Sequence, residues 1–173
     1  MRSFELVLFR HGDKLLNPPS DPALSPVGRV KAETFAQRLG NDFSLPSVLW
    51  SSPKLRARQS FAPAAEKFSL PLKESPLLLE AQSDETVLHF ENRIKKFIAS
   101  LAGSSDPIHY ACSHYDWVLR FSELGLGSKI HNHPQCMHWR PFQFVHFKMI
   151  IAPSESLWDA EVIQSGAIEP KGN

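Results

Sequence analysis

A chain of 173 residues with 42% hydrophobic and 21% charged residues has the size and composition of one globular domain. Its formal net charge of +1 argues against a nucleic-acid partner, because binding to phosphate backbones needs a strongly basic surface. The first apolar segment begins by residue 4, with no signal peptide and no apolar run of membrane length before it. We therefore expect a cytoplasmic protein with no membrane partner. Nothing in the sequence indicates an oligomeric state.

Strand and helix signals alternate along the first two thirds of the chain. Apolar runs predict strands at residues 4–9, 48–50 and 107–112. Helical periodicity predicts helices over residues 26–39, from about 53, from 83 or 84 to 101, and over 116–124. This alternation favours a mainly parallel sheet with helices on both faces, a three-layer α/β/α sandwich forming a single domain over residues 1–173.

Two Ser-Pro pairs indicate where the first two helices begin. Ser25 is expected to cap the first helix, with Pro26 as its first residue and Val27, Val30 and Phe35 among its apolar positions. Ser52 and Pro53 repeat the signal, which places Arg56 in the first turn of the second helix. Pro63 is expected to kink or end that helix.

The last third of the chain is less regular. Residues 70–82 look extended. Residues 142–151 alternate in hydropathy and predict a strand lying partly at a sheet edge, and residues 158–164 are a candidate for one more. The tail from Ser165 is polar and is expected to be loosely ordered.

Polar residues with a common chemistry follow three of the predicted strands. Arg10-His11-Gly12 follows the first, Arg56 lies just beyond the second, and His114 follows the third. Ligands of open α/β sheets bind at the carboxyl ends of the strands. Arginine forks and a second histidine can surround the oxygens of a transferring phosphoryl group, while a neutral His11 attacks phosphorus. A backbone carbonyl near Gly12 is expected to hold the proton on the other ring nitrogen of His11.

Each of these residues has a plainer interpretation. Arg56 could be a solvated cation on the helix surface, although a cation in a first helical turn opposes the helix dipole. His114 could be a core histidine, although its place between a strand end and a helix start suits an anion site.

Three further segments follow Arg10-His11-Gly12 in order along the chain: Leu24-Ser25-Pro26-Val27-Gly28-Arg29, Ser51-Ser52-Pro53-Lys54-Leu55-Arg56-Ala57 and Ser113-His114. With these segments the chain resembles the histidine phosphatase superfamily, also called phosphoglycerate mutase-like, over residues 4 to about 125. The resemblance implies that fold and a catalytic core formed by four residues, Arg10, His11, Arg56 and His114. It also implies a metal-independent phosphatase that forms a covalent phosphohistidine on His11.

The sequence departs from the pattern of the family around the acid that protonates the leaving oxygen. Glu80 is the best candidate, with Asp84 and Glu85 as alternatives, and a surface glutamate is the competing interpretation. The Gly-x-Trp-Glu-Gly-like stretch of the family is missing around it, and Tyr115-Asp116 stands where mutases carry Gly-Gly. Both departures resemble the compact branch that includes the phosphohistidine phosphatase SixA, where a phosphoramidate leaving group needs a weaker acid or none. By the same resemblance Asn17 is a candidate substrate contact, or else a turn asparagine.

We therefore expect a phosphatase acting on a small phosphorylated metabolite or on a phosphohistidine-bearing protein. A phosphoglycerate mutase-like phosphotransferase is an alternative, but such chains are longer and carry substrate-binding insertions absent here. A non-catalytic module that binds a phospho-ligand is the other alternative. No cofactor is expected, and His131, His133 and His138 match no common metal-ligand spacing, so rim or loop positions suit them better.

Overall fold

The computed structural model describes residues 2–18, 20–152 and 158–170. The elements follow one another as β1 (Arg2–Arg10), α1 (Pro26–Arg38), β2 (Leu49–Ser51), α2 (Leu55–Phe68), β3 (Leu72–Glu74), η1 (Pro76–Leu78), α3 (Val87–Ala102), β4 (Ile108–Ser113), α4 (Tyr115–Leu126), η2 (Gly127–Asn132), η3 (Pro134–Cys136), β5 (Gln143–Ile151) and β6 (Trp158–Ala167), where η marks a 3₁₀ helix. None of the helices in the described residues is long and apolar enough to cross a bilayer.

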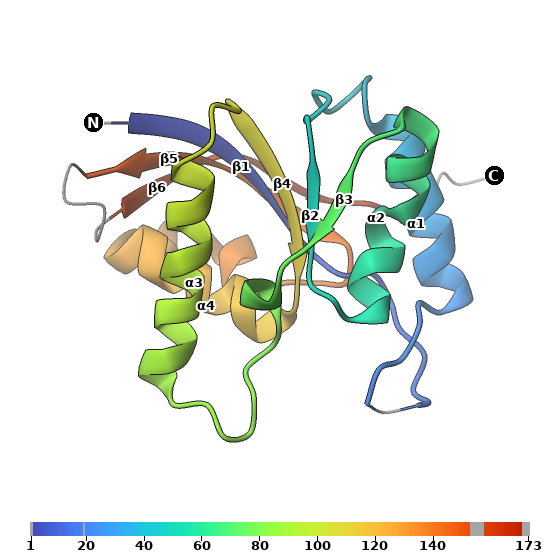
Figure 1. Ribbon diagram of the computed structural model, residues 1–173, viewed down its shortest axis with the longest axis horizontal. Coiled ribbons are helices and arrows are strands. Elements are labelled where there is room, and N and C mark those ends of the chain that lie inside the picture. The colour runs from blue at the N-terminus through green and yellow to red at the C-terminus, as the bar shows by residue number, and fades with distance from the viewer. Residues whose placement is uncertain (1, 19, 153–157, 171–173) are drawn as a thin grey trace.

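The strands form one six-stranded sheet in the order β3-β2-β4-β1-β5-β6. The four strands from β3 to β1 are parallel, and β5 and β6 are added antiparallel beside β1 (Figure 1). The prediction of a mainly parallel sheet is therefore confirmed. The parallel register aligns the carboxyl ends of β1, β2 and β4, since Arg10 pairs with Ser113 and Ser51 pairs with Cys112.

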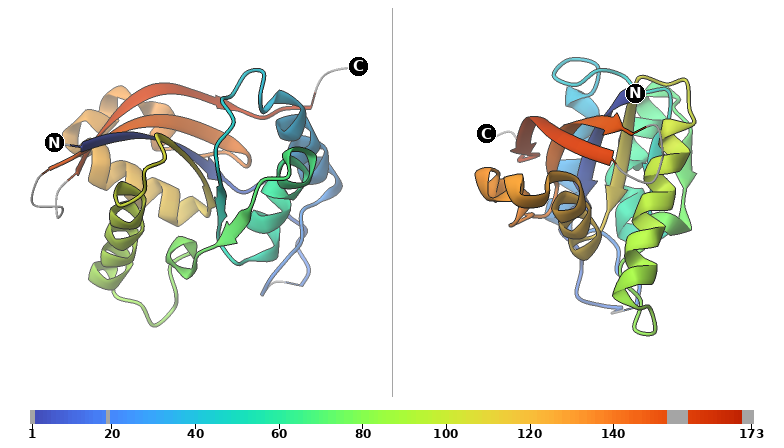
Figure 2. Two further views of the ribbon diagram at one scale, coloured as in Figure 1. Left: turned by 45° about the horizontal axis from the view of Figure 1, so that its top comes forward. Right: turned by 90° about the vertical axis from the view of Figure 1, so that its left-hand side faces the viewer.

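Helices cover both faces of the sheet, as the sequence predicts. Strand β1 alternates, sending Leu6 and Leu8 to one core cluster and Val7 and Phe9 to the other. The first cluster is completed by α3 and α4, and the second by α1 and α2, on opposite sides of the sheet (Figures 1 and 2). A strand segment buried on both faces has to be apolar, which explains the unbroken apolar run of residues 6–9 in β1.

The predicted start of α1 is confirmed, and that of α2 needs a correction. Ser25 caps α1, its hydroxyl accepting a hydrogen bond from Gly28 N. Helix α2 begins two residues later than Ser52-Pro53 suggested, with Lys54 at the N-cap position and no side-chain cap, because the Ser52 hydroxyl is engaged elsewhere. Arg56 still lies in the first turn.

One prediction about each helix interior is wrong in part. Helix α2 does not end at Pro63 but continues to Phe68, because the fully buried Phe61 and Ala64 hold it against the sheet across the missing hydrogen bond. On α1, the predicted apolar positions Val27 and Val30 are exposed, whereas the predicted Phe35 is buried, together with Ala32.

The start of α3, the position of β5 in the sheet and the extent of the ordered tail also differ from the sequence-based expectations. Helix α3 begins at Val87, because the Thr86 hydroxyl caps it by accepting from His89 N. Strand β5 lies inside the sheet between β1 and β6, so it is not an edge strand. The tail is ordered further than predicted, since β6 runs to Ala167 and Ile168 is fully buried.

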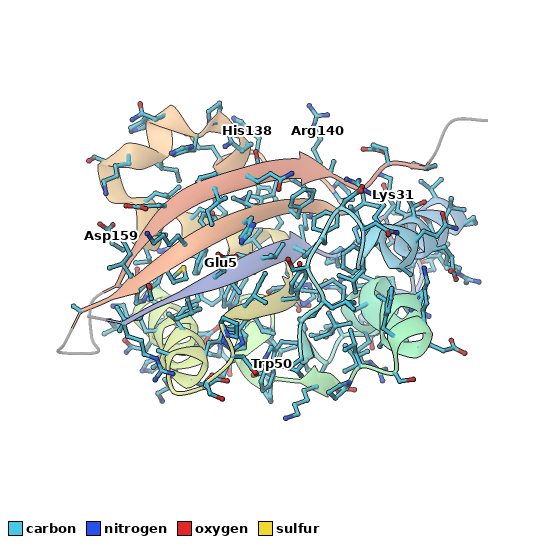
Figure 3. The ribbon with its side chains drawn as sticks, turned by 90° about the horizontal axis from the view of Figure 1, so that it is seen from above. Glu5, Lys31, Trp50, His138, Arg140 and Asp159 are labelled. Atoms are coloured by element: carbon cyan, nitrogen blue, oxygen red, sulfur yellow. The ribbon has the colours of Figure 1, made fainter. Side chains whose placement is uncertain are left out.

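Viewed from above, the central strand β1 carries Glu5, with Asp159 of β6 on one side and Trp50 of β2 on the other (Figure 3).

Candidate active site

Three strand ends are joined into one platform at the carboxyl edge of the parallel strands. His11 N donates to Ser113 O at 2.9 Å, and Ser52 N donates to Cys112 O at 3.0 Å. The backbone hydrogen bonds of the sheet therefore continue one residue beyond the strands. This continuation places His11, Ser52 and His114, the residue after Ser113, side by side.

Arg56 is the centre of the polar cluster on this platform. Its Nε–H donates to His11 Nε2 at 3.1 Å, and its Nη2 lies 3.0 Å from His114 Nδ1 and 3.0 Å from Glu80 Oε1. The side chain is buried, so Arg56 is not a solvated cation on the helix surface. One guanidinium thus joins both histidines and the carboxylate that the sequence singled out.

The contacts of His11 define its protonation state. Because His11 Nε2 accepts from Arg56, the ring proton must sit on Nδ1, which donates to Gly12 O at 2.8 Å. The backbone carbonyl expected from the sequence is therefore present. Burial lowers the pKa of His11 to about 3, with further lowering by the cations of Arg56 and Arg10 against the raising effect of Gly12 O. Neutral His11 consequently keeps a lone pair on Nε2, the atom that faces the cluster.

His114 is held in the opposite tautomer by the same arginine. Its Nδ1 accepts from Arg56, so its Nε2–H donates to Ser52 Oγ at 2.8 Å. Glu80 Oε2 lies 3.1 Å from the same nitrogen. Burial lowers the pKa of His114 to about 2, with smaller contributions from His11 and Arg56. His114 is thus a neutral N–H donor whose ring centroid is 5.2 Å from that of His11.

Arg10 lies at the border of the cluster. Its Nη1 donates to Trp139 O at 2.7 Å, and its guanidinium carbon lies 5.1 Å from the centroid of the Tyr115 ring. Its Nε is buried and has no hydrogen-bond partner among residues 2–18, 20–152 and 158–170. Burial lowers the pKa of Arg10, against the raising effects of Tyr115 and Asp13. The side chain therefore retains a buried donor that an anion bound beside His11 can use.

Of the three candidate acids, Glu80 is the one that reaches the cluster, at Arg56 and His114. It contacts Arg56 and His114 as described, and Lys54 Nζ lies 3.7 Å from its Oε1. Glu85 instead forms an ion pair with Arg93 at 2.7 Å, and Arg93 lowers the pKa of Glu85 by hydrogen bonding. Asp84 is exposed.

The remaining candidates do not join the cluster. Asn17 is exposed on the loop after β1, and no hydrogen bond to the cluster is found for it in the described part of the chain. His131 and His138 are exposed and His133 is half-buried, and within the described ranges no group of three or more side chains could hold a metal ion. Figure 3 shows His138 on the β6 side of the sheet, across β1 from Trp50.

Two serines and an aspartate support the cluster and were not identified from the sequence. Ser60 Oγ accepts from Gly12 N at 2.9 Å and donates to Arg56 O at 2.8 Å, which ties the loop after β1 to α2. Asp21 accepts from Leu55 N at 2.9 Å at the start of α2. Ser52 was interpreted only as a helix cap. Its position directly after a strand, beside the predicted site, was the available signal.

The cluster combines a neutral imidazole, a neutral imidazole N–H, two guanidinium groups and a carboxylate. Such a set can attack an electrophilic centre from His11 Nε2, surround developing negative charge with N–H donors, and exchange a proton at Glu80. These are components that phosphoryl transfer uses.

Comparisons with known proteins agree with this chemistry. The sequence profile of the histidine phosphatase superfamily (branch 1) matches residues 6–95, just over half of the chain. No curated protein matches the sequence. Among solved structures, a protein from Nakamurella multipartitia assigned as the phosphohistidine phosphatase SixA superposes with a TM-score of 0.75 at 16% identity, covering 99% of each chain.

Two further solved structures are similar in fold. The protein histidine phosphatase SixA complexed with tungstate has a TM-score of 0.72 at 16% identity, covering 95% of this chain and 97% of its own. A mycobacterial glucosyl-3-phosphoglycerate phosphatase in complex with VO3 has a TM-score of 0.74 at 18% identity, covering 95% of this chain and 99% of its own.

Proposed function

Because this chain belongs to the histidine phosphatase superfamily (branch 1), we propose that it is a metal-independent phosphatase. It hydrolyses a phosphomonoester or a phosphohistidine through a covalent phosphohistidine on His11. The observation that carries the proposal is the double contact of Arg56, whose N–H groups require His11 Nε2 and His114 Nδ1 both to be acceptors. This leaves His11 as a nucleophile and His114 as a donor without any change of protonation.

The first half of the reaction forms the phosphohistidine. The Arg56 Nε–H moves from His11 Nε2 to an oxygen of the bound phosphoryl group, and the freed lone pair of Nε2 attacks phosphorus while the bond from phosphorus to the leaving oxygen breaks. Arg10, Arg56 and the Nε2–H of His114 stabilise the charge on the three remaining oxygens. Glu80, in its carboxylic acid form, gives its proton to the leaving oxygen, so an alcohol departs.

The second half restores the enzyme. The Glu80 carboxylate takes a proton from a water molecule, whose oxygen attacks phosphorus as the bond to Nε2 breaks. The products are inorganic phosphate, neutral His11 and protonated Glu80, so the cycle closes. Nδ1–H remains bonded to Gly12 O throughout and keeps the ring oriented.

The position of Glu80 favours phosphate esters as substrates alongside phosphohistidine. A carboxyl group in contact with Arg56 and His114 supplies the acid that an alcohol leaving group needs. The solved relatives named above include one protein histidine phosphatase and one phosphatase of a phosphorylated metabolite. We propose a small phosphorylated metabolite or a phosphohistidine-bearing protein as partner, and a single catalytic domain over residues 1–173.

Turnover of three substrates by wild-type enzyme and two variants tests the proposal. His11→Ala should abolish turnover of an alkyl phosphate, an aryl phosphate and a phosphohistidine peptide alike. Glu80→Gln should slow the alkyl phosphate by about 100- to 10,000-fold, the usual range for general acid catalysis, and the other two far less, because their leaving groups need no strong acid.

The same assay distinguishes the alternatives. A module that only binds phospho-ligands would hold phosphate and release no product. Equal loss on all three substrates in Glu80→Gln would make Glu80 a structural residue.

A further inference from the structure

The orientation of Glu80 is not set by regular secondary structure. Residues 79–86 lie between η1 and α3 and belong to neither a helix nor a strand. A carboxylate on such a segment faces Arg56 and His114 only if side chains from elsewhere hold its backbone. Among the described residues, two side chains from outside the segment make such contacts, one from α3 and one from α4, while Trp117 Nε1 and Ser113 Oγ bind Leu77 O and Leu78 O just before it.

Arg93 of α3 binds the segment with its whole guanidinium. Its Nη1 donates to Leu77 O at 3.1 Å and to Leu79 O at 2.7 Å, and its Nη2 donates to Glu80 O at 3.1 Å. The three carbonyls surround the turn that leads into Glu80. Because the fork of arginine is planar and rigid, binding three carbonyls fixes the path of the backbone as well as its distance from α3.

The remaining donors of Arg93 fix the guanidinium itself. Nε donates to Glu85 Oε1 at 2.8 Å and Nη2 donates to Glu85 Oε2 at 2.7 Å, a two-point pairing. One face of the group lies over the ring of Phe90, with its central carbon 5.0 Å from the centroid. Arg93 is therefore held between the two ends of the segment, since Glu85 lies at its far end.

Asp116, near the start of α4, holds the residue after Glu80. Its Oδ2 accepts from Ala81 N at 2.6 Å, while its Oδ1 accepts from Trp117 N at 2.8 Å. His114, which contacts Glu80, lies two residues earlier in the same chain turn. The Asp116 contact thus ties the Glu80 backbone to the element that carries His114.

We propose that Arg93 is a positioning residue for Glu80. With Asp116 it holds the backbone of residues 79–81 so that the Glu80 carboxylate faces Arg56 and His114. The inference rests on the proposed function, in which Glu80 protonates the leaving oxygen. Arg93 itself touches no reacting atom, and its contribution is therefore confined to reactions that need the acid.

The test is a double-mutant cycle with substrates of different leaving groups. Arg93→Met removes the fork but keeps an apolar stem over Phe90. It should lower kcat on an alkyl phosphate by about 10- to 100-fold, the loss expected when a catalytic group moves by about 1 Å. KM and turnover of an aryl phosphate should change little. In a Glu80→Gln background the same substitution should cost less than about threefold, because coupled residues are not additive.

Two further variants separate positioning from general stability. Arg120→Met is the matched control, since Arg120 on α4 is also an ion-paired arginine, bound to Glu91 and Glu123, and no hydrogen bond from it to the segment is found among the described residues. It should leave kcat unchanged on every substrate. If Arg93→Met fails to fold, Glu85→Gln is a milder variant, because it removes only part of the support of Arg93. Its loss of kcat on the alkyl phosphate should be smaller than that of Arg93→Met and equally selective for that substrate.

Two results would overturn the inference, and they are distinguishable. Suppose that Glu80→Gln slows the alkyl phosphate selectively. If Arg93→Met, or Glu85→Gln in its place, then slows all substrates equally, or lowers kcat by the same factor in the Glu80→Gln background as in the wild type, Arg93 has only a structural role. If Glu80→Gln itself shows no selectivity, the role of Glu80 fails and the positioning role fails with it.

Discussion

Gly28 lies where α1 touches the loop that carries His11, and replacing it by alanine should move that loop. A Cβ at position 28 would lie 2.2 Å from Asp13 O and 3.1 Å from Asp13 N. Non-bonded atoms settle near 3.5 Å, so α1 and the Asp13 backbone must separate by roughly 1 Å. The contact is with backbone, which has no rotamer through which it could yield.

The magnitude follows from two opposing effects. Overpacking of this kind destabilises by about 1–3 kcal/mol, and the severity of the contact places Gly28→Ala at the upper end. The better helix propensity of alanine offsets roughly 1 kcal/mol. The net loss of about 2 kcal/mol corresponds to a decrease in Tm of roughly 4–8 °C for a chain of this size.

Activity should fall as well, because Asp13 directly follows Gly12. Gly12 O orients the His11 ring, and Asp13 O accepts from Ser25 N at 2.8 Å. A shift of about 1 Å in this loop can cost about 100-fold in kcat/KM.

Thermal unfolding followed by circular dichroism, together with aryl phosphate turnover, measures both effects of Gly28→Ala. Gly103→Ala is the control, because a Cβ there meets its nearest atom at an ordinary 3.5 Å. Its Tm and turnover should match the wild type within about 1 kcal/mol of stability. A Gly28→Ala enzyme with wild-type Tm and turnover would refute the reasoning.

Four other predictions concern the site itself. Arg56→Lys keeps the charge but loses the fork that binds His11 and His114. It should lower kcat by at least about 100- to 1,000-fold, the loss typical of removing one donor to a transition-state oxyanion. Arg58→Lys, on the exposed side of α2, should leave kcat unchanged. Because the pKa of His11 is lowered from 6.5 to about 3, kcat/KM should show no acid limb from this histidine between pH 5 and 7, and a limb near 6.5 that disappears in His11 variants would contradict the assignment. Between pH 5 and 6.5, His11 and His114 become protonated only in the unfolded chain, because folding lowers the pKa of both. The free energy of unfolding should therefore fall as pH falls from 6.5, by roughly 1.4 kcal/mol per pH unit for each histidine. In urea titrations, His11→Gln should reduce this dependence on pH. Turnover should survive a chelator such as EDTA, and a loss that zinc or magnesium restores would count against metal-independent chemistry.

The centre of the site could be predicted because its residues directly follow strand ends. His11 and His114 come one residue after β1 and β4, and Arg56 lies in the first turn after β2, so parallel pairing alone brings them to one edge. Glu80 was chosen for its place in the chain, but its contacts depend on Arg93 and Asp116. Those two residues are 13 and 35 positions away from the backbone groups that they bind. No local pattern encodes such contacts.

Local signals failed where packing or a competing partner was stronger. Pro63 was expected to kink or end α2, but the helix continues to Phe68 because its buried face outweighs one missing hydrogen bond. Ser52 has the position of a helix cap, yet its hydroxyl pairs with His114. Val27, Val30 and Phe35 fit one apolar helical stripe, but Phe35 is buried and the two valines are exposed to solvent.

Rapid acid and alkaline quench of wild-type enzyme during turnover of a labelled phosphate ester tests the central claim most directly. The phosphate should be stable in alkali and labile in acid, and peptide mapping should place it on Nε2 of His11, the ring nitrogen that accepts from Arg56. His11→Ala should carry none. Full turnover by His11→Ala, or a phosphate trapped on any other residue, would contradict the account.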